Sequence, residues 1–255
     1  MRTQDGGHCD AAVDALAERA YETAGDRYTR AGRRILADPR EAVGPFEADE
    51  RGWVGQGLQC LVTAVVAYRV AGADDRATWR AVAGTATAKD LTNGLDHPAQ
   101  HACLAEVAAD FRAAGDLDGV ADAYETAAER YEAAGDAVSE PQVLATSPLF
   151  EAAATPLQQV ARGQANGEIA ITWEDLHGSD PGRPGAFLAS RARYKRQRFS
   201  GLVEGAVDDG HLAAPRRTTE YDNDVYRCPN CGANDVNWAG SDVLCMRCST
   251  PVERV

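Results

Sequence analysis

The sequence predicts a mainly α protein, in which a helical-repeat or helical-bundle N-terminal domain precedes a basic helix and hairpin segment and then a small β unit. Three observations support this fold class. Residues 10–140 are dense in alanine, and their apolar positions recur every three or four residues. Basic side chains outnumber acidic ones in residues 183–217 of an otherwise acidic chain. Four cysteines stand in two close pairs near the C-terminus. We therefore expect three units, at residues 10–140, 157–224 and 225–255.

The helical part carries an internal similarity. Ala-Tyr-Glu-Thr-Ala at 20–24 recurs at 123–127, and both copies continue with Arg-Tyr and Ala-Gly at matching distances. Gly32, Gly72 and Gly115 are spaced by 40 and 43 residues, which is about one helical hairpin per step. Each follows an alanine where we expect a helix to end, since glycine readily takes the left-handed cap.

This pattern resembles tetratricopeptide or SNAP-type helical repeats. The resemblance implies stacked helical hairpins whose surface binds another protein. A plain helical bundle is the alternative. Two stretches interrupt the helices: residues 38–57 predict a loop that contains Trp53, and residues 139–156, with three prolines, predict a linker or short helices between domains.

The segment at 183–217 holds eight basic and three acidic residues. An apolar stripe from Phe199 predicts a helix that ends at Gly210, and Arg191–Arg198 would form its preceding turns. A short helix capped by Thr172 is expected at 173–177. Residues 216–221 and 225–228 flank Asp-Asn-Asp and predict a hairpin.

With a further helix expected near residues 157–164, this order of elements resembles a winged-helix domain, which implies contact with nucleic acid. The alternative is that the basic helix packs against the acidic helical part. In the first case, phosphates would be contacted by the cluster Arg191, Arg193, Lys195, Arg196 and Arg198.

The cysteines carry the most specific chemical signal. Cys228-Pro-Asn-Cys231 is followed, after thirteen residues, by Cys245-Met-Arg-Cys248. A CxxC turn points both sulfurs the same way, so two such turns complete a tetrahedron around one ion. Four thiolates favour one structural Zn²⁺ with no open coordination position. Iron and a redox dithiol pair are the alternatives, although a redox CxxC normally begins a helix after a strand.

Between the two pairs, Val236–Trp238 and Val243–Leu244 predict two short strands joined by residues 239–242, and Trp238 is expected in the core of this small unit. Residues 225–252 resemble a zinc ribbon, which implies a fold and a metal but no particular activity. Cys9, Cys60 and Cys103 are interpreted as reduced, small apolar residues.

The charge composition of the chain bears on the salt concentration of its natural environment. The chain has 255 residues, 39 acidic and 26 basic, with a net charge of −13, and only Lys89 and Lys195 are lysines. This acidic, lysine-poor composition resembles proteins of extreme halophiles, and an acidic protein encoded by a GC-rich mesophile is the alternative. No apolar run is long enough to span a membrane and no secretory signal is visible, so we expect a cytoplasmic protein.

Three functions remain open at this point. The first is a non-enzymatic, zinc-binding adaptor of a halophilic archaeon, whose helical repeats dock a protein partner. The second is a DNA-binding transcriptional regulator that uses residues 183–217. The third is an enzyme with a site between the two parts, although the sequence has no phosphate-binding loop, dinucleotide fingerprint or nucleophile elbow. The sequence does not indicate an oligomeric state.

Overall fold

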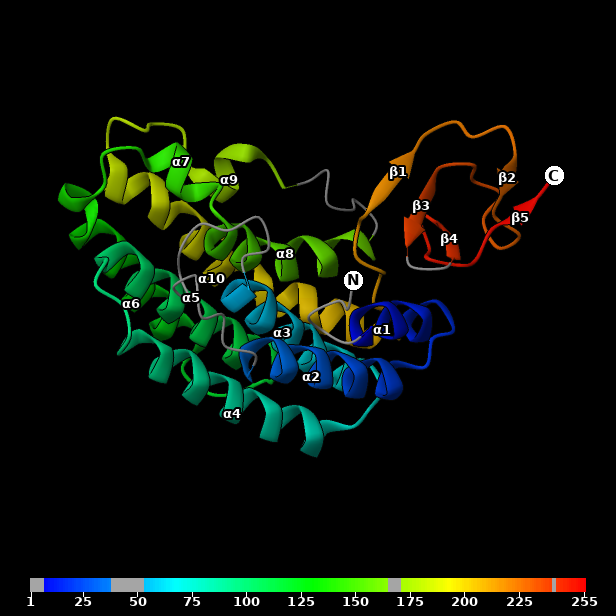
Figure 1. Ribbon diagram of the computed structural model, residues 1–255, viewed down its shortest axis with the longest axis horizontal. Helices are drawn as coiled ribbons and strands as arrows, with labels where there is room; N and C mark the ends of the chain where they lie inside the picture. Colours follow the sequence, from blue (N-terminus) through cyan, green and yellow to red (C-terminus); the bar gives the residue numbers. More distant parts are fainter. Residues whose placement is uncertain (1–6, 38–52, 165–170, 240–241) are drawn as a thin grey trace.

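The computed structural model describes residues 7–37, 53–164, 171–239 and 242–255. Ten α-helices come first in this part of the chain and short antiparallel strands follow, which confirms the predicted fold class (Figure 1). The first six helices are α1 (His8–Ala17), α2 (Tyr21–Ala37), α3 (Trp53–Val70), α4 (Asp74–Thr92), α5 (Pro98–Ala114) and α6 (Val120–Ala133). Each packs against the next in sequence.

The remaining helices return across this array. After the 3₁₀ turn η1 (Gly135–Ala137), they are α7 (Pro141–Ala145), α8 (Pro148–Arg162), α9 (Trp173–His177) and α10 (Pro184–Asp208). Helix α8 packs on α3 and α5, and α10 packs on α3, α5, α6 and α8. The chain's own C-terminal helices therefore cover the side of α3 and α5 that faces away from α4.

Several predicted boundaries can be compared with these helices. Thr172 caps α9 through a capping box with Asp175, and α10 includes residues 191–208, as expected. The predicted loop at 38–57 is wrong at its end, because α3 begins at the buried Trp53, while residues 38–52 lie outside the described part of the chain. Residues 139–156 form α7 and the first turns of α8, which continues through Pro156.

The glycines that follow alanine mark two helix ends and two close contacts. Gly72 has a left-handed φ of 70° after α3, as predicted. Gly115 caps the end of α5, as predicted, but its φ is −96° and not left-handed. Gly32 instead lies inside α2, where a Cβ would meet the Gly57 carbonyl oxygen of α3 at 2.7 Å. A Cβ on Gly115 would meet the Ala81 Cβ at 2.2 Å. These two positions need glycine because neighbouring helices approach closely there.

The strands form two small sheets. The first joins β1 (Thr218–Glu220), β3 (Val236–Ala239) and β4 (Asp242–Cys245) in the order β1-β3-β4, and the second pairs β2 (Tyr226–Arg227) with β5 (Glu253–Arg254). The predicted strands between the cysteine pairs are confirmed, with Val236 opposite Cys245. The predicted hairpin of residues 216–221 with 225–228 is wrong, because β1 pairs with β3 and β2 pairs with β5.

The β part lies at one end of the molecule, beside α1 (Figure 1). Val13 of α1 shares a small apolar cluster with Ala214, Ala239 and Leu244. At the edge of this contact Arg217 pairs with Asp10 at 2.8 Å. Among the described helices, none combines the length and the hydropathy that a membrane span requires.

Candidate metal centre

The four predicted ligands converge. Sγ atoms of Cys228, Cys231, Cys245 and Cys248 all lie within 4.8 Å of one another. The Sγ–Sγ distance is 3.5 Å from Cys228 to Cys248 and 3.5 Å from Cys231 to Cys245. Cys228 and Cys245 are buried, whereas Cys231 is exposed. The centre therefore sits near the surface of the β part, with one side closed by protein.

Two loops of the same shape present the sulfurs. Gly232 N–H donates to the carbonyl of Cys228 at 2.9 Å, and Ser249 N–H donates to that of Cys245 at 2.9 Å. Each loop then turns through a left-handed residue, Gly232 with φ 72° and Ser249 with φ 54°. The sequence indicates the first of these positions through its glycine. It gives no comparable signal for the second, where a serine takes a conformation that favours glycine.

Ser249 has a contact that helps to explain why a serine stands there. It is buried, and its Oγ accepts a hydrogen bond from the backbone N–H of Ala214 at 3.0 Å. Asn237 of β3 also binds this segment. Its Oδ1 accepts a hydrogen bond from Arg217 N–H, and its Nδ2 donates one to the carbonyl of Pro215, each at 2.9 Å. Polar side chains of the β part thus hold the segment that arrives from α10.

The sulfur geometry fits a tetrahedral ion. Zn–S bonds of about 2.3 Å at tetrahedral angles place sulfurs about 3.8 Å apart, close to the 3.5 and 3.7 Å of the shorter pairs here. Four thiolates satisfy Zn²⁺ completely, so an ion held by these cysteines would fix the two loops and would have no position left for water or substrate. The donor set and its spacing suit zinc, and four thiolates at this spacing also suit iron.

The thiols differ in acidity when no ion is present. Burial raises the pKa of Cys228 and that of Cys245. Burial also works against ionisation of Cys248, but hydrogen bonds from Thr250 and Asn230 outweigh it and lower its pKa to about 6. A cation is therefore needed to hold Cys228 and Cys245 as thiolates at neutral pH.

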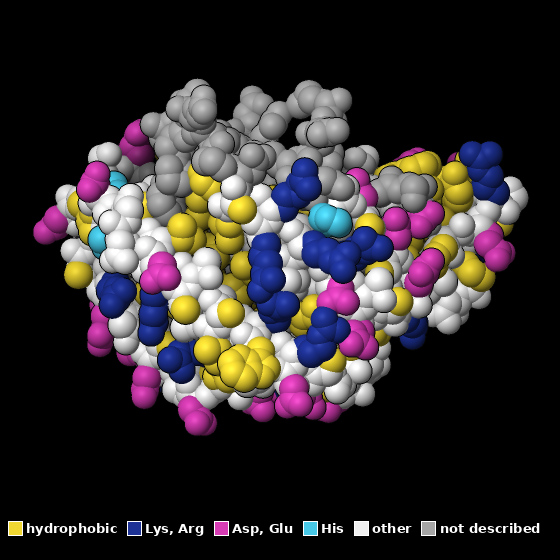
Figure 2. Space-filling view, turned by 60° about the horizontal axis from the view of Figure 1, so that its bottom comes forward, with side chains coloured by type: hydrophobic (Ala, Val, Ile, Leu, Met, Phe, Trp, Pro, Cys, Tyr) yellow, Lys and Arg dark blue, Asp and Glu magenta, His cyan; other side chains and the backbone are white. Residues whose placement is uncertain are grey.

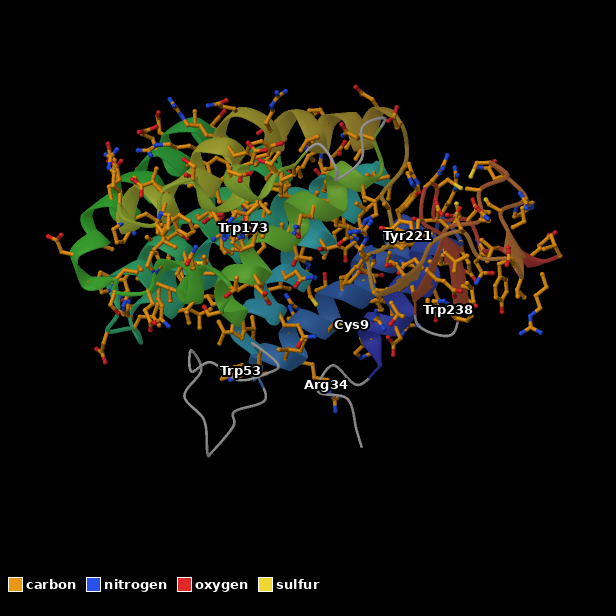
Figure 3. The ribbon with its side chains drawn as sticks, turned by 90° about the horizontal axis from the view of Figure 1, so that it is seen from above. Cys9, Arg34, Trp53, Trp173, Tyr221 and Trp238 are labelled. Atoms are coloured by element: carbon orange, nitrogen blue, oxygen red, sulfur yellow. The ribbon has the colours of Figure 1, made fainter. Side chains whose placement is uncertain are left out.

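Aromatic side chains of the β part are more exposed than predicted. Trp238 is 39 % exposed and packs edge-on against Tyr226, with ring centroids 5.5 Å apart. The expectation that Trp238 belongs to the core is wrong, since the other three residues of β3 are buried and Trp238 is exposed. Figure 3 shows Trp238 and Tyr221 on the β part, far from Trp173 and Trp53 of the helical part.

The basic cluster of α10 divides into inner and outer residues. Arg191 and Lys195 are 2 % and 0 % exposed, so these side chains cannot reach a phosphate, and their prediction as nucleic-acid contacts is wrong. Arg193 pairs with Glu132 at 2.6 Å and Arg196 with Glu125 at 3.2 Å, both on α6. Arg198 is exposed. For Arg193, Arg196 and Arg198, nucleic-acid contact stays a prediction; the packing of α10 on the acidic helices is confirmed.

The inner residues belong to a buried ionic cluster with α5. Arg191 donates from Nε and Nη2 to the two carboxylate oxygens of Glu106, at 2.7 and 2.9 Å. Lys195 Nζ lies 2.8 Å from Glu106 and 2.6 Å from Asp110. The hydroxyl of Tyr131 donates to Glu106 at 2.8 Å. The sequence gives no sign of this cluster, because its partners stand 85 residues apart in different predicted units.

The chain matches no protein-family model, no curated protein sequence and no solved structure.

Proposed function

We propose that this protein is a non-enzymatic adaptor, in which a structural Zn²⁺ fixes the β part and the helical part docks a protein partner. The observation that carries the proposal is the set of four cysteine sulfurs within 4.8 Å of one another. Because such a donor set closes the coordination sphere of zinc, the metal would build structure and would not activate water. In this proposal the protein acts by binding a partner and catalyses no reaction.

The metal loops are coupled to the helical part. Val243 and Leu244 of β4 lead into Cys245, and Leu244 packs in the cluster with Val13 of α1. Ser249, directly after Cys248, binds the backbone of Ala214. Loss of the ion would free both loops, and this contact with α1 would loosen with them. A β part stabilised by zinc and packed on the end of the helices therefore suits an adaptor, because the surfaces of the two parts keep a fixed relative position.

In the part of the chain that the structure describes, α8 and α10 leave one side of the helical array uncovered. Helices α8 and α10 occupy the side of α3 and α5 away from α4, and the cluster of Glu106, Asp110, Arg191 and Lys195 holds α10 there. The proposal assigns docking to the outer side formed by α2, α4, α5 and α6, because α8 and α10 do not cover it. Two of the five basic residues of α10 that were predicted to contact DNA are buried. This burial weakens the case for a DNA-binding regulator and favours the adaptor.

The composition supports a halophilic, cytoplasmic setting for this adaptor. A net charge of −13 with two lysines suits molar salt, where the Debye length falls to about 3 Å and self-repulsion weakens. The three remaining cysteines, of which Cys9 and Cys60 lie 3.6 Å apart at Sγ, are thiols and not a disulfide, which suits a reducing compartment.

The metal is tested first. Purified protein is expected to hold one Zn²⁺ per chain by elemental analysis, and Cys228→Ser is expected to lose it. Cys9→Ser is the matched control, because Cys9 lies outside the four-cysteine cluster and should leave the zinc content unchanged. Protein without metal, iron in place of zinc, or a Cys228→Ser variant with full zinc content would contradict the proposal.

Docking is tested by affinity capture with the full chain at molar KCl, with and without nuclease. The adaptor proposal expects one defined protein partner that survives nuclease treatment. Capture that nuclease abolishes would favour the regulator. Turnover of a small molecule by the purified, zinc-loaded protein would favour an enzyme.

A further inference from the structure

A groove runs over α5 between α4 and α6 and encloses about 580 Å³. Its floor is small and largely apolar, since Leu104, Ala105 and Ala108 of α5 line it. One wall carries Thr92 and Asn93 at the end of α4, and the other carries Thr126 of α6. The volume lies within the range of ligand-binding pockets, and the small floor residues are what make the hollow.

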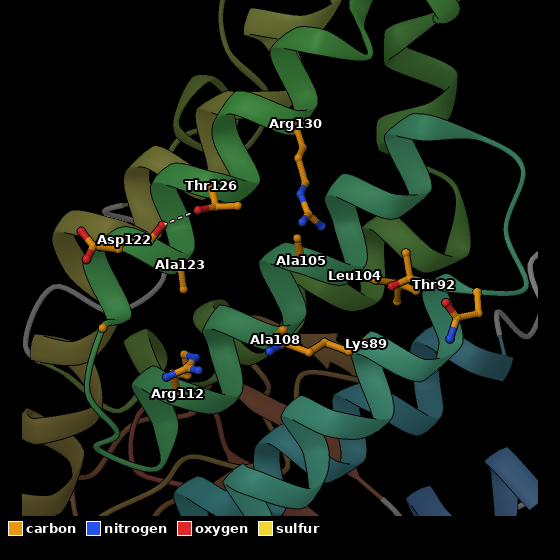
Figure 4. A pocket seen from close by; sticks show the side chains of 12 residues that line it. Lys89, Thr92, Leu104, Ala105, Ala108, Arg112, Asp122, Ala123, Thr126 and Arg130 are labelled. Carbon is orange, nitrogen blue, oxygen red and sulfur yellow. Dashed lines mark hydrogen bonds between the residues drawn. The ribbon is translucent and has the colours of Figure 1, made fainter.

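Three cations surround this groove, one from each helix: Lys89 of α4, Arg112 of α5 and Arg130 of α6 (Figure 4). Within the described part of the chain, none of the three has a carboxylate at ion-pair distance. Arg112 is held in place because its Nη1 donates to the Asp118 carbonyl at 2.7 Å. A guanidinium has five N–H donors, so most of those on Arg112 remain for a ligand.

These cations contrast with those of α10, where four of the five basic residues in the cluster at 191–198 bind carboxylates of α5 or α6. The groove adds only one carboxylate of its own, Asp122. In a chain of net charge −13, three cations beside one acid form a local positive site. Such a site concentrates acidic ligands, although the chain as a whole carries a net negative charge.

The positive character continues across α4. A second hollow of about 300 Å³ lies between α2, α3 and α4, and its lining includes Arg33 and Arg80. Figure 2, which brings the side of α2 and α4 forward, shows Lys and Arg side chains across the middle of this face and most Asp and Glu side chains toward its edges. The surface is therefore larger than a single small anion needs.

We propose that the groove between α4 and α6 binds an acidic, extended peptide segment of the protein partner, a proposal that rests on the adaptor function above. Carboxylates of the segment meet Lys89, Arg112 and Arg130, and its smaller apolar side chains lie on Leu104, Ala105 and Ala108. The Thr92 and Thr126 hydroxyls donate to the carbonyls of Ala88 and Asp122, so their oxygens accept from the peptide N–H groups. Asn93 supplies both a donor and an acceptor.

The shape favours a peptide over a nucleic acid. A duplex presents a convex row of phosphates, whereas the cations here line a hollow with an apolar floor. Single strands bind through aromatic stacking platforms, and no aromatic residue lines this groove in the described part of the chain. An extended peptide suits both features, because alternate side chains point to opposite sides and so separate its carboxylates from its apolar groups.

The test uses the full, zinc-loaded chain at the lowest KCl concentration at which circular dichroism shows it folded. The probe is a short fluorescein-labelled peptide of alternating Glu and Leu, followed by fluorescence polarisation. A peptide with Gln in place of Glu and a single-stranded oligonucleotide of equal charge are compared with it. We expect saturable binding of the Glu peptide, and at least about tenfold weaker binding of the Gln peptide and of the oligonucleotide.

Three variants locate the binding. Lys89→Met with Arg130→Met keeps long side chains but removes two charges, and is expected to weaken the Glu peptide by about tenfold or more. Ala105→Phe fills the floor without changing charge and is expected to abolish binding. Arg198→Met is the matched control, since Arg198 is an exposed arginine of α10 away from the groove, and its affinity should stay within about twofold.

The outcomes separate this proposal from the adaptor function. Four results would each contradict the proposal that the groove binds an acidic peptide. The Glu peptide does not bind, the Gln peptide binds equally well, the oligonucleotide binds more tightly, or Arg198→Met loses as much affinity as the groove variants. If affinity capture yields a defined partner that the Lys89→Met, Arg130→Met variant still holds, the adaptor stands and the groove is overturned. If the Glu peptide binds as expected and no partner is captured, the groove is supported and the adaptor function falls.

Discussion

Glu106 is the residue on which the helical part depends most for electrostatic balance. Its carboxylate is fully buried between Arg191 and Lys195 and also accepts the Tyr131 hydroxyl. Burial opposes its charge, but the two adjoining cations outweigh burial and lower the pKa of Glu106 to about 2. With Asp110, the cluster holds two carboxylates and two cations, so the charges balance and none is left alone in the interior.

Removal of one member should therefore be costly. Glu106→Gln leaves Arg191 and Lys195 with a single carboxylate, and we expect the free energy of unfolding to fall by about 3–5 kcal/mol. Glu132→Gln is the matched control, because its pair with Arg193 is half-exposed and such pairs contribute about 0–1 kcal/mol. Urea denaturation measures both. Equal losses in the two variants would show that the buried cluster does not hold α10 in place.

Asp110 gives the cluster a pH dependence of its own. Burial raises the pKa of Asp110 to about 6, above its ordinary value, despite the neighbouring Lys195. The folded state therefore binds more protons than the unfolded state between about pH 4 and pH 6, and this group's contribution to stability falls as pH rises through that window. In Asp110→Asn the titration is absent. The wild-type minus variant difference in unfolding free energy should decline from about pH 4 to pH 6 and stay level above it; a difference that rises or stays flat over that window would contradict the raised pKa.

At the scale of elements, close contact between backbones decides where α10 can lie. A Cβ on Gly185, in the first turn of α10, would meet the Glu132 and Tyr131 carbonyl oxygens of α6 at 2.7 and 2.9 Å. A Cβ on Gly135, the glycine of the second Ala-Gly copy, would meet the Gly185 backbone nitrogen at 3.0 Å. Two glycines thus let the start of α10 approach the end of α6, next to the ionic cluster.

One helix offers both the test and its control. Gly185→Ala should destabilise the protein, because its methyl group meets backbone that cannot rotate away. In Gly201→Ala of the same helix, the new Cβ would meet no described atom within 4 Å apart from its chain neighbours and the adjacent backbone of α10. Alanine should there raise the free energy of unfolding by about 0.5–1 kcal/mol. Thermal and urea unfolding of the two variants should thus shift in opposite directions. A neutral Gly185→Ala would mean that α10 can shift away from α6 at little cost.

Local patterns predicted elements well and partners poorly. The two cysteine pairs and the strands between them follow from short-range spacing, and both were predictable. The hairpin was wrong although its turn exists: Asn223 Oδ1 accepts the backbone N–H groups of Val225 and Tyr226 at 2.8 and 2.9 Å. This turn directs the chain to β5 instead of back to β1, because β5 and β3 lie later in the sequence and compete as partners.

The same limit applies to charge. A run of arginines on α10 has the same composition whether it faces solvent or Glu106, and only the fold brings α5 beside it. Gly32 likewise indicates a helix end by its neighbours, yet α3 needs it for close packing. Sequence patterns report the periodicity of a single segment; long-range partners depend on how segments pack, which no window of the chain contains.

At the scale of the whole molecule, the net charge of −13 sets the response to salt. Exposed carboxylates repel one another at low ionic strength, and this repulsion weakens as the Debye length falls from about 10 Å at 0.1 M to about 3 Å at 1 M. The buried cluster is screened far less, because water and ions do not reach it. Salt should therefore stabilise this protein through its surface and leave the contribution of the buried cluster unchanged.

The melting temperature is accordingly expected to rise steeply with KCl from low to molar concentration. A triple variant with Asp90→Asn, Asp96→Asn and Asp118→Asn removes three exposed carboxylates, and should begin from a higher melting temperature at low salt and rise less. The loss caused by Glu106→Gln should be the same at both ends of the salt range, since that pair is buried. Differential scanning calorimetry of the three proteins across the range checks all three expectations. A flat melting temperature for the wild type would contradict the halophilic setting, and an unchanged slope in the triple variant would show that surface repulsion is not its cause.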